Sequence, residues 1–383
     1  MPLKVTSQEY FGVGSLDFIH KILAHENPSS IMLVKGKTSY QQSGAVAILS
    51  PALKPYSVTE FSEFSANPQW KEILLGIKIW RKQKPDLIIA IGGGSSIDVA
   101  KIITIFSEQE GDPELYLERK KNLQPRAAKF VAIPTTSGTG SEATHFAVVY
   151  RDKKKYSVAH HSLLPDYSII DPSLTFSLSA YQTACTGMDA LAQAIESYWS
   201  IHATEESKKH AREAISLVLA HLETAVKNPN AEARAGMTKA ANYAGKAINI
   251  SFTTACHALS YPITSYFDIP HGHAVALTLP EMIVYNAETS QQDCLDQRQA
   301  KYVKKTMQEL YALFQVQSAL EMKSKIEELM DKIGLQRTLS ALEIKTEAQM
   351  EIIIKNGFDQ ERMKNNPRLL NEINVQKILQ KIR

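Results

Sequence analysis

The second half of the chain contains three side chains of the types that bind divalent metals, Asp189, His257 and His271. Asp189 and Gln193 stand four residues apart in a helical pattern, so their side chains share one face of that helix. The neighbouring residues are small or apolar, which predicts a buried helix, and a buried carboxylate without a partner is costly. His257 and His271 supply imidazoles. Together with Asp189 they form a common donor set for a divalent metal, although each histidine alone also fits a hydrogen-bonded structural role.

Two loops in the first half have the chemistry of phosphate binding. Gly92, Gly93 and Gly94 follow an apolar run and precede a helical pattern. Glycines let backbone N–H groups approach a diphosphate closely, and a helix N-terminus adds partial positive charge. The motif is neither GxGxxG nor a Walker loop, and the alternative is a plain strand-to-helix turn with Ser95 as the N-cap.

The second loop, residues 134–142, follows another apolar run and is rich in hydroxyl groups and glycine. Two such loops at the ends of two parallel strands can face one crevice, which is where ligands bind in open α/β sheets. The two motifs together predict a nucleotide site.

The elements that must position these residues divide the chain in two. Residues 1–178 alternate short apolar runs with helical patterns, which predicts an α/β domain with a parallel, Rossmann-like sheet covered by helices. Strands are expected at 30–34, 86–91, 129–133 and 168–171, and helices at 70–83 and 97–107.

Residues 179–383 show one helical pattern after another and no convincing strand, which predicts an all-helical domain. Helices are expected at 181–200, 205–226, 230–250, 252–264, 274–288, 298–315, 318–333, 339–344 and 346–356, with a short surface helix in the charged tail 358–383.

Composition narrows the function classes. The chain of 383 residues is 44% hydrophobic and 22% charged with a net charge of +3, so nothing points to nucleic acid or an anionic membrane as a partner. Cys185, Cys256 and Cys294 form no CxxC pair, and their odd number argues against a disulfide framework. The first residues, Met1–Val5, lack the pattern of a signal peptide, and no apolar run is long enough to span a bilayer. We expect a cytoplasmic protein.

The motifs together resemble the iron-containing (group III) alcohol dehydrogenase family. The matching motifs are residues 92–101, 134–142, 187–191, 257–258 and 270–272, in collinear order. The resemblance implies the dehydroquinate synthase-like architecture of this family, in which a dinucleotide-binding α/β domain precedes an all-helical metal and substrate domain. It also implies NAD(P)H-linked interconversion of an alcohol and a small aldehyde or ketone, with Fe(II) or Zn(II) in the cleft between the domains, and a homodimer.

The resemblance assigns the metal ligands residue by residue. The family usually holds its metal with one aspartate and three histidines, and Asp189, His257 and His271 match three of these positions. Gln193 stands at the fourth, and an amide oxygen is a weaker ligand than an imidazole. We therefore expect metal binding to be retained but weaker. The alternative is loss of the metal, which would leave a nucleotide-binding protein without catalysis.

A second departure concerns proton transfer. The family often has a further histidine near the nicotinamide, and Tyr261 stands at that position. A phenol titrates near pH 10 when unperturbed, so it is a poorer proton shuttle at neutral pH than an imidazole. Tyr261 and His273 are the expected catalytic proton donors.

The residue after the first strand run bears on the choice of dinucleotide. NAD users in the family tend to carry an acid at the position of Gly36, where it binds the ribose hydroxyls. Glycine flanked by Lys35 and Lys37 favours NADPH over NADH, unless these lysines belong to a solvated turn. The expected cofactor-binding residues are Gly36, Lys37, Asn67, Gly93, Gly94, Ser95, Asp98, Thr135, Thr136, Thr139 and Lys155.

Polar residues near the metal motifs suggest the substrate. Lys246 and Asn249 lie one helical turn apart where the family usually has apolar residues, and they fit an anionic tail, unless Lys246 lies on a solvated helix face. With Gln193, Tyr261 and His273 they look like the phosphonoacetaldehyde reductase branch of phosphonate biosynthesis. That branch reduces phosphonoacetaldehyde to 2-hydroxyethylphosphonate.

Two other enzyme classes remain as alternatives. One is a general short-chain alcohol or butanol dehydrogenase. The other is a lyase or cyclase of the dehydroquinate synthase-like kind, which shares the architecture but recycles bound NAD.

Overall fold

The computed structural model describes residues 7–358 and 360–383. The chain divides into two compact units, Met1–Leu178 and Ser179–Arg383. The first is an α/β unit with a parallel sheet and the second is helical, so the predicted fold class is confirmed. The start of the chain, Met1–Val5, where no signal peptide is expected, lies outside the described residues.

The sheet of the first unit has six parallel strands in the order β1-β8-β5-β4-β2-β3. The four predicted strands correspond to β2, β4, β5 and β8. The edge strands β1 and β3 escaped prediction because they are short and half polar, unlike the apolar runs of the inner strands. The bounds are β1 Gln8–Phe11, β2 Ser30–Lys35, β3 Ser57–Phe61, β4 Leu87–Gly92, β5 Lys129–Pro134 and β8 Tyr167–Ile170.

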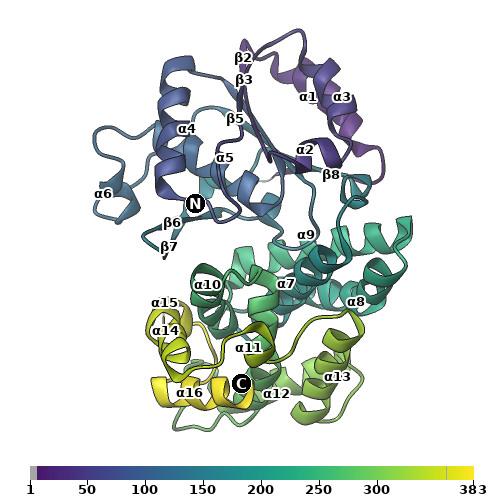
Figure 1. Ribbon diagram of the computed structural model, residues 1–383, viewed down its shortest axis with the longest axis vertical. Helices are drawn as coiled ribbons and strands as arrows, with labels where there is room; N and C mark the ends of the chain where they lie inside the picture. The colour runs from purple at the N-terminus through teal and green to yellow at the C-terminus, as the bar shows by residue number, and fades with distance from the viewer. Residues whose placement is uncertain (1–6, 359) are drawn as a thin grey trace. The chain divides into compact units, whose positions relative to one another are not determined.

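Alternate residues of the inner strands pack on opposite faces of the sheet. Met32 and Val34 pack in one core with α4 (Trp70–Gln83) and α5 (Gly94–Ser107). Ile31 and Leu33 pack in a second core. The helices of that face are α1 (Phe18–Glu26) and α3 (Val46–Leu53). Figure 1 shows the two helix pairs on either side of the strands. The inner strands are therefore buried on both faces, which is why they read as unbroken apolar runs.

The strand order reverses between β2 and β4. The chain runs from β2 outward to β3, then returns to β4 on the other side of β2 and continues to β5. The carboxyl ends of strands at such a switch point form a crevice in open α/β sheets. The turn after β2 contains Gly36, the turn after β4 contains Gly93, and Gly94 begins α5. The glycine-rich turns therefore flank the switch point.

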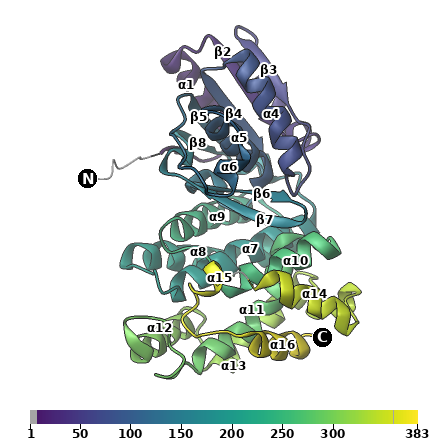
Figure 2. The same ribbon diagram turned by 90° about the vertical axis from the view of Figure 1, so that its left-hand side faces the viewer.

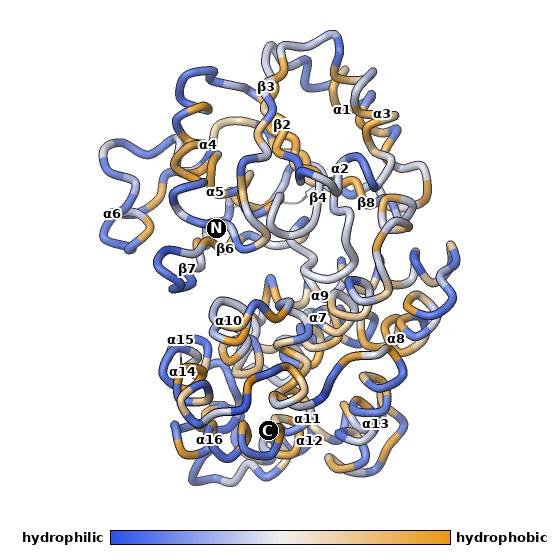
Figure 3. The backbone as a smooth tube through the Cα atoms, viewed as in Figure 1, coloured by the Kyte–Doolittle hydropathy of each residue, from blue (hydrophilic) through white to orange (hydrophobic). Residues whose placement is uncertain are grey.

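Smaller elements complete the first unit. A two-stranded antiparallel hairpin, β6–β7, lies outside the main sheet and was not predicted. Hydrophilic segments gather near α6 and β7, whereas β2 is hydrophobic (Figure 3). The remaining elements are α2 Ser39–Gln42, α6 Glu114–Leu117, β6 Phe146–Arg151, β7 Lys154–Ala159 and the short 3-10 helices Ser15–Asp17, Ser141–Ala143, His161–Leu163 and Pro172–Thr175.

The second unit consists of helices that follow the predicted order. The pattern at 339–344 forms only a 3-10 turn, Ser340–Leu342. The helix expected from 252 begins at Ala255, because Phe252 has a φ of 63° and ends the preceding helix. The helices are α7 Ala180–Trp199, α8 Glu205–Lys227, α9 Ala231–Ser251, α10 Ala255–Phe267, α11 His271–Ala287, α12 Gln299–Leu313, α13 Ala319–Lys332, α14 Glu347–Gly357, α15 Gln360–Met363 and α16 Glu372–Lys381.

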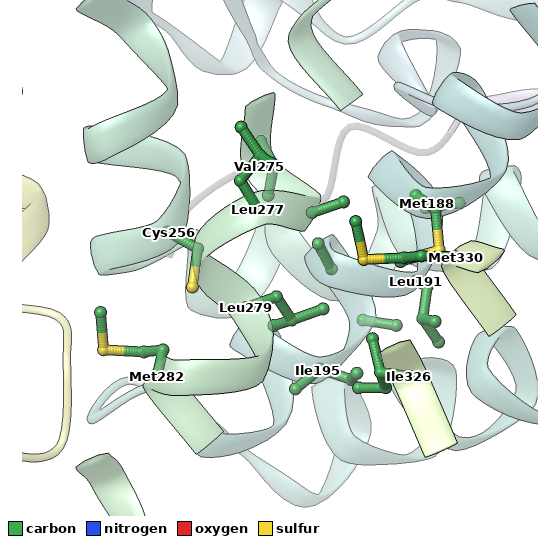
Figure 4. Packing of buried hydrophobic residues seen from close by; sticks show 14 of the residues in the cluster. Met188, Leu191, Ile195, Cys256, Val275, Leu277, Leu279, Met282, Ile326 and Met330 are labelled. Atoms are coloured by element: carbon green, nitrogen blue, oxygen red, sulfur yellow. The ribbon is translucent and has the colours of Figure 1, made fainter. Parts of the chain in front are cut away.

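Helix α7 is the centre of the helical core. It packs against α8, α9 and α11, and Figure 2 shows these helices together within the second unit. Its apolar residues Met188, Leu191 and Ile195 lie among side chains of α11 and α13 (Figure 4). A Cβ atom on Gly187 would collide with Leu222 of α8, so this glycine allows the two helices to pack closely. In the described residues, no helix combines the length and the apolar character needed to cross a bilayer.

Truncation of a core residue of α7 tests this packing. Leu191 is fully buried, so Leu191→Ala should lower the free energy of unfolding by about 2–5 kcal/mol through lost burial and a cavity. The measurement is urea unfolding followed by circular dichroism. The control is Leu320→Ala at a leucine that is 64% exposed, which should change stability little. Equal effects of the two variants would contradict the assigned packing.

Candidate functional site

Asp189, His257 and His271 come together in the helical unit although they belong to three helices. One ligand atom from each lies within 4.8 Å of the others. His257 Nε2 lies 3.3 Å from Asp189 Oδ1, and His271 Nε2 lies 3.9 Å from the same oxygen. Asp189 comes from the middle of α7, His257 from the first turn of α10 and His271 from the first residue of α11. The three predicted side chains therefore converge on one small volume.

Buried lone pairs in this cluster lack hydrogen-bond partners. Among the described residues, Asp189 Oδ1, Gln193 Oε1 and His257 Nε2 are buried and make no hydrogen bond. The short distance between Asp189 Oδ1 and His257 Nε2 does not have hydrogen-bond geometry, so we treat it as an approach of two acceptors. Buried polar atoms are rarely left unsatisfied in proteins. One carboxylate oxygen, one amide oxygen and two imidazole nitrogens are a donor set that fits a divalent metal.

Glu196 fixes the orientation of His257. The Nδ1 of His257 donates to Glu196 Oε2, so the proton sits on that nitrogen and Nε2 keeps its lone pair toward Asp189. The other oxygen of Glu196 accepts bonds from Thr254 Oγ1 at 2.8 Å and from the Cys256 backbone N–H at 2.7 Å. Such outer carboxylates orient metal-binding histidines in many metalloproteins.

Glu196 was not singled out by the sequence reasoning. A signal was present, because Glu196 stands seven residues after Asp189 and therefore lies on the same helix face. A third polar residue on a buried face is as informative as the first two.

Ser260 plays the corresponding part for His271. The Ser260 hydroxyl donates to the His257 carbonyl oxygen at 2.7 Å. Its oxygen lies 3.2 Å from His271 Nδ1. Because the serine proton is already used, His271 Nδ1 carries the proton of this bond. The lone pair of Nε2 then points toward Asp189.

A glycine brings α11 against α7. A Cβ atom on Gly272 would overlap the Cys185 carbonyl oxygen and lie 3.0 Å from Asp189 Cβ. Only glycine therefore lets the N-terminus of α11 approach α7 closely enough for His271 to reach the cluster. This is the structural reason for glycine after the histidine.

In this cluster, burial and the neighbouring charges shift the pKa values of the ionisable groups in opposite directions. Burial raises the pKa of Asp189 and of Glu196, but the facing histidines outweigh it, and both pKa values end below their usual range. Burial lowers the pKa of His257, but Glu196 and Asp189 outweigh it and raise that pKa overall. The carboxylates are thus ionised at neutral pH, as a metal site requires.

The two expected proton donors differ in their surroundings. The Tyr261 ring stacks on His271, with centroids 6.0 Å apart and an interplanar angle of 19°. The His273 ring is buried, donates from Nε2 to the Gln336 carbonyl oxygen at 2.7 Å and lies 3.1 Å from the Tyr181 hydroxyl. Burial lowers the pKa of His273. His273 thus uses both ring nitrogens in hydrogen bonds within the protein, whereas the Tyr261 ring contacts a residue of the cluster.

The expected anion residues lie on α9. Lys246 and Asn249 are half-buried, and the Lys246 ammonium lies 5.6 Å from the centroid of the Tyr243 ring on the same helix. Lys246 is therefore partly covered and is not a fully solvated lysine.

In the first unit, the two predicted phosphate loops lie side by side at the ends of the neighbouring strands β4 and β5. A Cβ atom on Gly93 would lie 3.3 Å from the Thr136 methyl, and one on Gly94 would lie 2.7 Å from Thr139. The glycines leave the space that brings the second loop against the first. Gly93, and not Ser95, is the N-cap of α5.

Two residues of α5 hold the second loop. Ser141 Oγ donates to Asp98 Oδ1 at 2.6 Å, and the Val148 N–H donates to Oδ2 at 3.0 Å. Lys101 Nζ donates to the carbonyl oxygens of Ser141 and Thr144 at 2.6 and 2.7 Å, and burial lowers its pKa to about 8. Asp98, expected at the cofactor, thus binds the second loop through one oxygen and strand β6 through the other.

The remaining expected cofactor residues surround the same strand ends. A Cβ atom on Gly36 would collide with Ser39 and lie 3.6 Å from Ser96 Oγ at the start of α5. Lys37 Nζ pairs with Glu63 at 3.2 Å, and both side chains are exposed.

Four further expected cofactor residues lie in different surroundings. The Ser95 hydroxyl donates to the Ala66 carbonyl, next to Asn67, whose own carbonyl accepts from Gln69 Nε2 at 2.7 Å. Thr135 Oγ1 is buried without a hydrogen-bond partner among the described residues. Lys155 is half-buried on β7.

Comparisons with known proteins bear on both units. The chain is 32% identical over 390 residues to an NADPH-dependent butanol dehydrogenase of Clostridium saccharobutylicum, covering 97% of this chain and 95% of that protein. It is 34% identical over 242 residues to a phosphonoacetaldehyde reductase of Streptomyces viridochromogenes, covering 61% of each. It spans only 34% of the length of an aldehyde-alcohol dehydrogenase of Streptococcus pneumoniae that it matches at 34% identity.

A solved structure shares the fold over nearly the whole chain. Sulfoacetaldehyde reductase from Bifidobacterium kashiwanohense in complex with NAD+ aligns with a TM-score of 0.85 at 30% identity, covering 98% of this chain and 96% of that one. The family models for iron-containing alcohol dehydrogenase match residues 6–172 and, for the C-terminal part, residues 183–383. The chain therefore belongs to the iron-containing alcohol dehydrogenase family.

Proposed function

We propose that this protein is an NAD(P)H-dependent, metal-assisted reductase of a small aldehyde, and that it also runs in the direction of alcohol oxidation. The observation that carries the proposal is the set of buried, unpaired acceptors Asp189 Oδ1, Gln193 Oε1 and His257 Nε2 next to His271. A metal is the simplest group that satisfies all of them at once.

In this proposal Asp189, Gln193, His257 and His271 hold Fe(II) or Zn(II). A bound divalent cation would supply Lewis-acid polarisation of the carbonyl oxygen, and a reduced nicotinamide would supply the hydride. Glu196 and Ser260 keep the two imidazoles in the tautomer that offers Nε2 to the metal. Tyr261, stacked on His271, holds the proton that the product alkoxide takes up.

The first unit, residues 1–178, is the proposed dinucleotide-binding domain. The glycine turns after β2 and β4 and the threonine loop after β5 leave backbone N–H groups and hydroxyls for the phosphates. Gly36 removes the acid that would repel a 2′-phosphate. Lys37 supplies a cation, and its exposed pair with Glu63 is weak enough to be exchanged for a phosphate. We therefore favour NADPH over NADH.

The proposed substrate is phosphonoacetaldehyde and the product 2-hydroxyethylphosphonate. Two of the relatives named above are reductases of aldehydes with an acidic group, a phosphonate in one and a sulfonate in the other. Lys246 and Asn249 fit such an acidic group. The second candidate is a short-chain alcohol such as butanol, since a butanol dehydrogenase matches almost the whole chain. The family resemblance adds a homodimer to the proposal, and the three free cysteines fit a cytoplasmic protein.

Removal of the Glu196 charge tests the metal site without an activity assay. Glu196→Gln keeps the shape but weakens the hold on His257, so metal affinity should fall about 10- to 100-fold. Competition with a chromogenic chelator measures this with Fe(II) and with Zn(II). The control is Glu281→Gln, a buried acid on α11 that pairs with Lys323 and Lys381. Unchanged affinity in Glu196→Gln would exclude this role.

Gln193→His tests whether position 193 belongs to the coordination shell. An imidazole is a stronger ligand than an amide oxygen, so metal should bind at least about 10-fold more tightly. The same chelator competition gives the affinity. If neither metal affinity nor turnover changes, Gln193 lies outside the shell.

Cofactor oxidation tests the reaction and the dinucleotide. The kcat/KM for NADPH should exceed that for NADH at least about 10-fold, because a phosphate held by one charged hydrogen bond contributes about 1.5–3 kcal/mol. Lys37→Gln should reduce this ratio. A clear NADH preference would overturn the dinucleotide assignment. Absence of turnover with any aldehyde after loading with Fe(II) or Zn(II) would favour a metal-free binding protein.

A further inference from the structure

Arg362 lies beside the proposed metal site although it is far from it in sequence. The residue belongs to α15, and its guanidinium carbon lies 5.2 Å from the centroid of the Tyr261 ring. The same ring stacks on His271. A single aromatic side chain thus contacts both the guanidinium and one of the proposed metal ligands.

The guanidinium is held in place by the segment that leads into α10. Arg362 Nη1 donates to Thr253 Oγ1 at 2.7 Å, and Asn365 Nδ2 donates to the Thr253 carbonyl oxygen at 3.1 Å. The next residue, Thr254, donates to Glu196, which orients His257. The arginine is therefore anchored to the same backbone that carries the histidine network. Its position is coupled to that of the metal ligands.

Arg362 also differs from other arginines of the helical unit in its charge environment. Within the described part of the chain, the half-buried guanidinium makes no ion pair with a carboxylate. Two other half-buried arginines of the helical unit are neutralised, Arg298 by Asp296 and Arg368 by Asp293. A partly desolvated guanidinium whose one acceptor among the described residues is a hydroxyl retains donors for a planar pair of anionic oxygens.

We infer that Arg362 binds the anionic group of the substrate and so makes the enzyme selective for aldehydes that carry a phosphonate or sulfonate. This inference rests on the proposed function, because the anion must stand close to the carbonyl bound at the metal. A guanidinium pairs with two oxygens of either group, while a neutral aldehyde leaves it uncompensated. The role of Tyr261 is then double, as it contacts the side chains at both ends of the substrate site.

Lys246 and Asn249 remain proposed anion-binding residues in addition to Arg362. They lie on α9, and Arg362 adds a recognition residue from the C-terminal part of the chain, beyond the motifs that carried the sequence reasoning. Selectivity for an anion then depends on two cations of different chemistry, a planar guanidinium and an ammonium.

Equilibrium binding of methylphosphonate tests the anion subsite independently of turnover. Calorimetric titration compares the metal-loaded parent protein with Arg362→Gln, Arg362→Lys and the control Arg337→Gln, a surface arginine paired with Asp331. Arg362→Gln should weaken methylphosphonate binding about 10- to 100-fold, Arg362→Lys should retain part of the affinity, and Arg337→Gln should match the parent. Equal affinities of the parent and Arg362→Gln would overturn the inference.

Steady-state kinetics with phosphonoacetaldehyde and butanal separate this inference from the proposed function. We expect Arg362→Gln to lower kcat/KM for the phosphonate about 10- to 100-fold, mainly through a higher KM. The kcat/KM for butanal should stay nearly unchanged. A purely structural role would lower both equally and would overturn the inference. If the parent enzyme shows no preference for the phosphonate, the proposed substrate fails, and the methylphosphonate titration still decides whether Arg362 forms an anion site.

Discussion

The hydrogen bond between Glu196 and His257 is the interaction on which the rest of the site depends. It places a carboxylate and an imidazole in the interior of a helical core, where neither is stable alone. Glu196 then needs further donors, which Thr254 and Cys256 provide at the start of α10. His257 is left with one unprotonated nitrogen, which faces Asp189. Glu196 thus has its hydrogen-bond partners within the protein, and the unpartnered acceptors of the core lie together at Asp189, Gln193 and His257.

Close helix approaches make this arrangement possible. Gly187 admits α8 against one side of α7, and Gly272 admits the first turn of α11 against the other. Gly272 lies against the side of α7 that carries Asp189, whereas Gly187 lies on the side that packs against Leu222. Apolar packing of Met188, Leu191 and Ile195 stabilises the helix that presents the acids (Figure 4). Stability and chemistry therefore reside on different faces of one helix.

The candidate phosphate site of the first unit is built mainly from uncharged groups. Its turns after β2, β4 and β5 lie at the carboxyl ends of parallel strands around a switch point. The ionisable residues near them, the half-buried Asp98 and the buried Lys101, hydrogen-bond to the segment after β5. The two units thus present different chemistry, with hydroxyls and backbone amides at the strand ends of one and carboxylates and imidazoles in the core of the other.

Much of this could be read from the sequence because its signals are local. Inner strands buried on both faces give unbroken apolar runs, and helices of more than three turns give clear periodicity, so β2, β4, β5, β8 and most of the helices were predictable. Short edge strands β1 and β3 and the hairpin β6–β7 lack such runs. Asp189, His257 and His271 were found from residue type and motif, without knowledge of their distances.

Only the tertiary structure decided which polar residues meet. Sequence spacing relates residues on one helix, so it links Asp189 with Gln193 but cannot show that Glu196 bonds to His257. The sequence made Tyr261 and His273 equally plausible as proton donors. In the structure, His273 hydrogen-bonds to the Gln336 carbonyl oxygen, whereas Tyr261 stacks on His271. Arg362 had no local signal, because its partners Thr253 and Tyr261 are about a hundred residues away. Contacts between distant segments are set by how helices pack, and that packing is a property of the whole core.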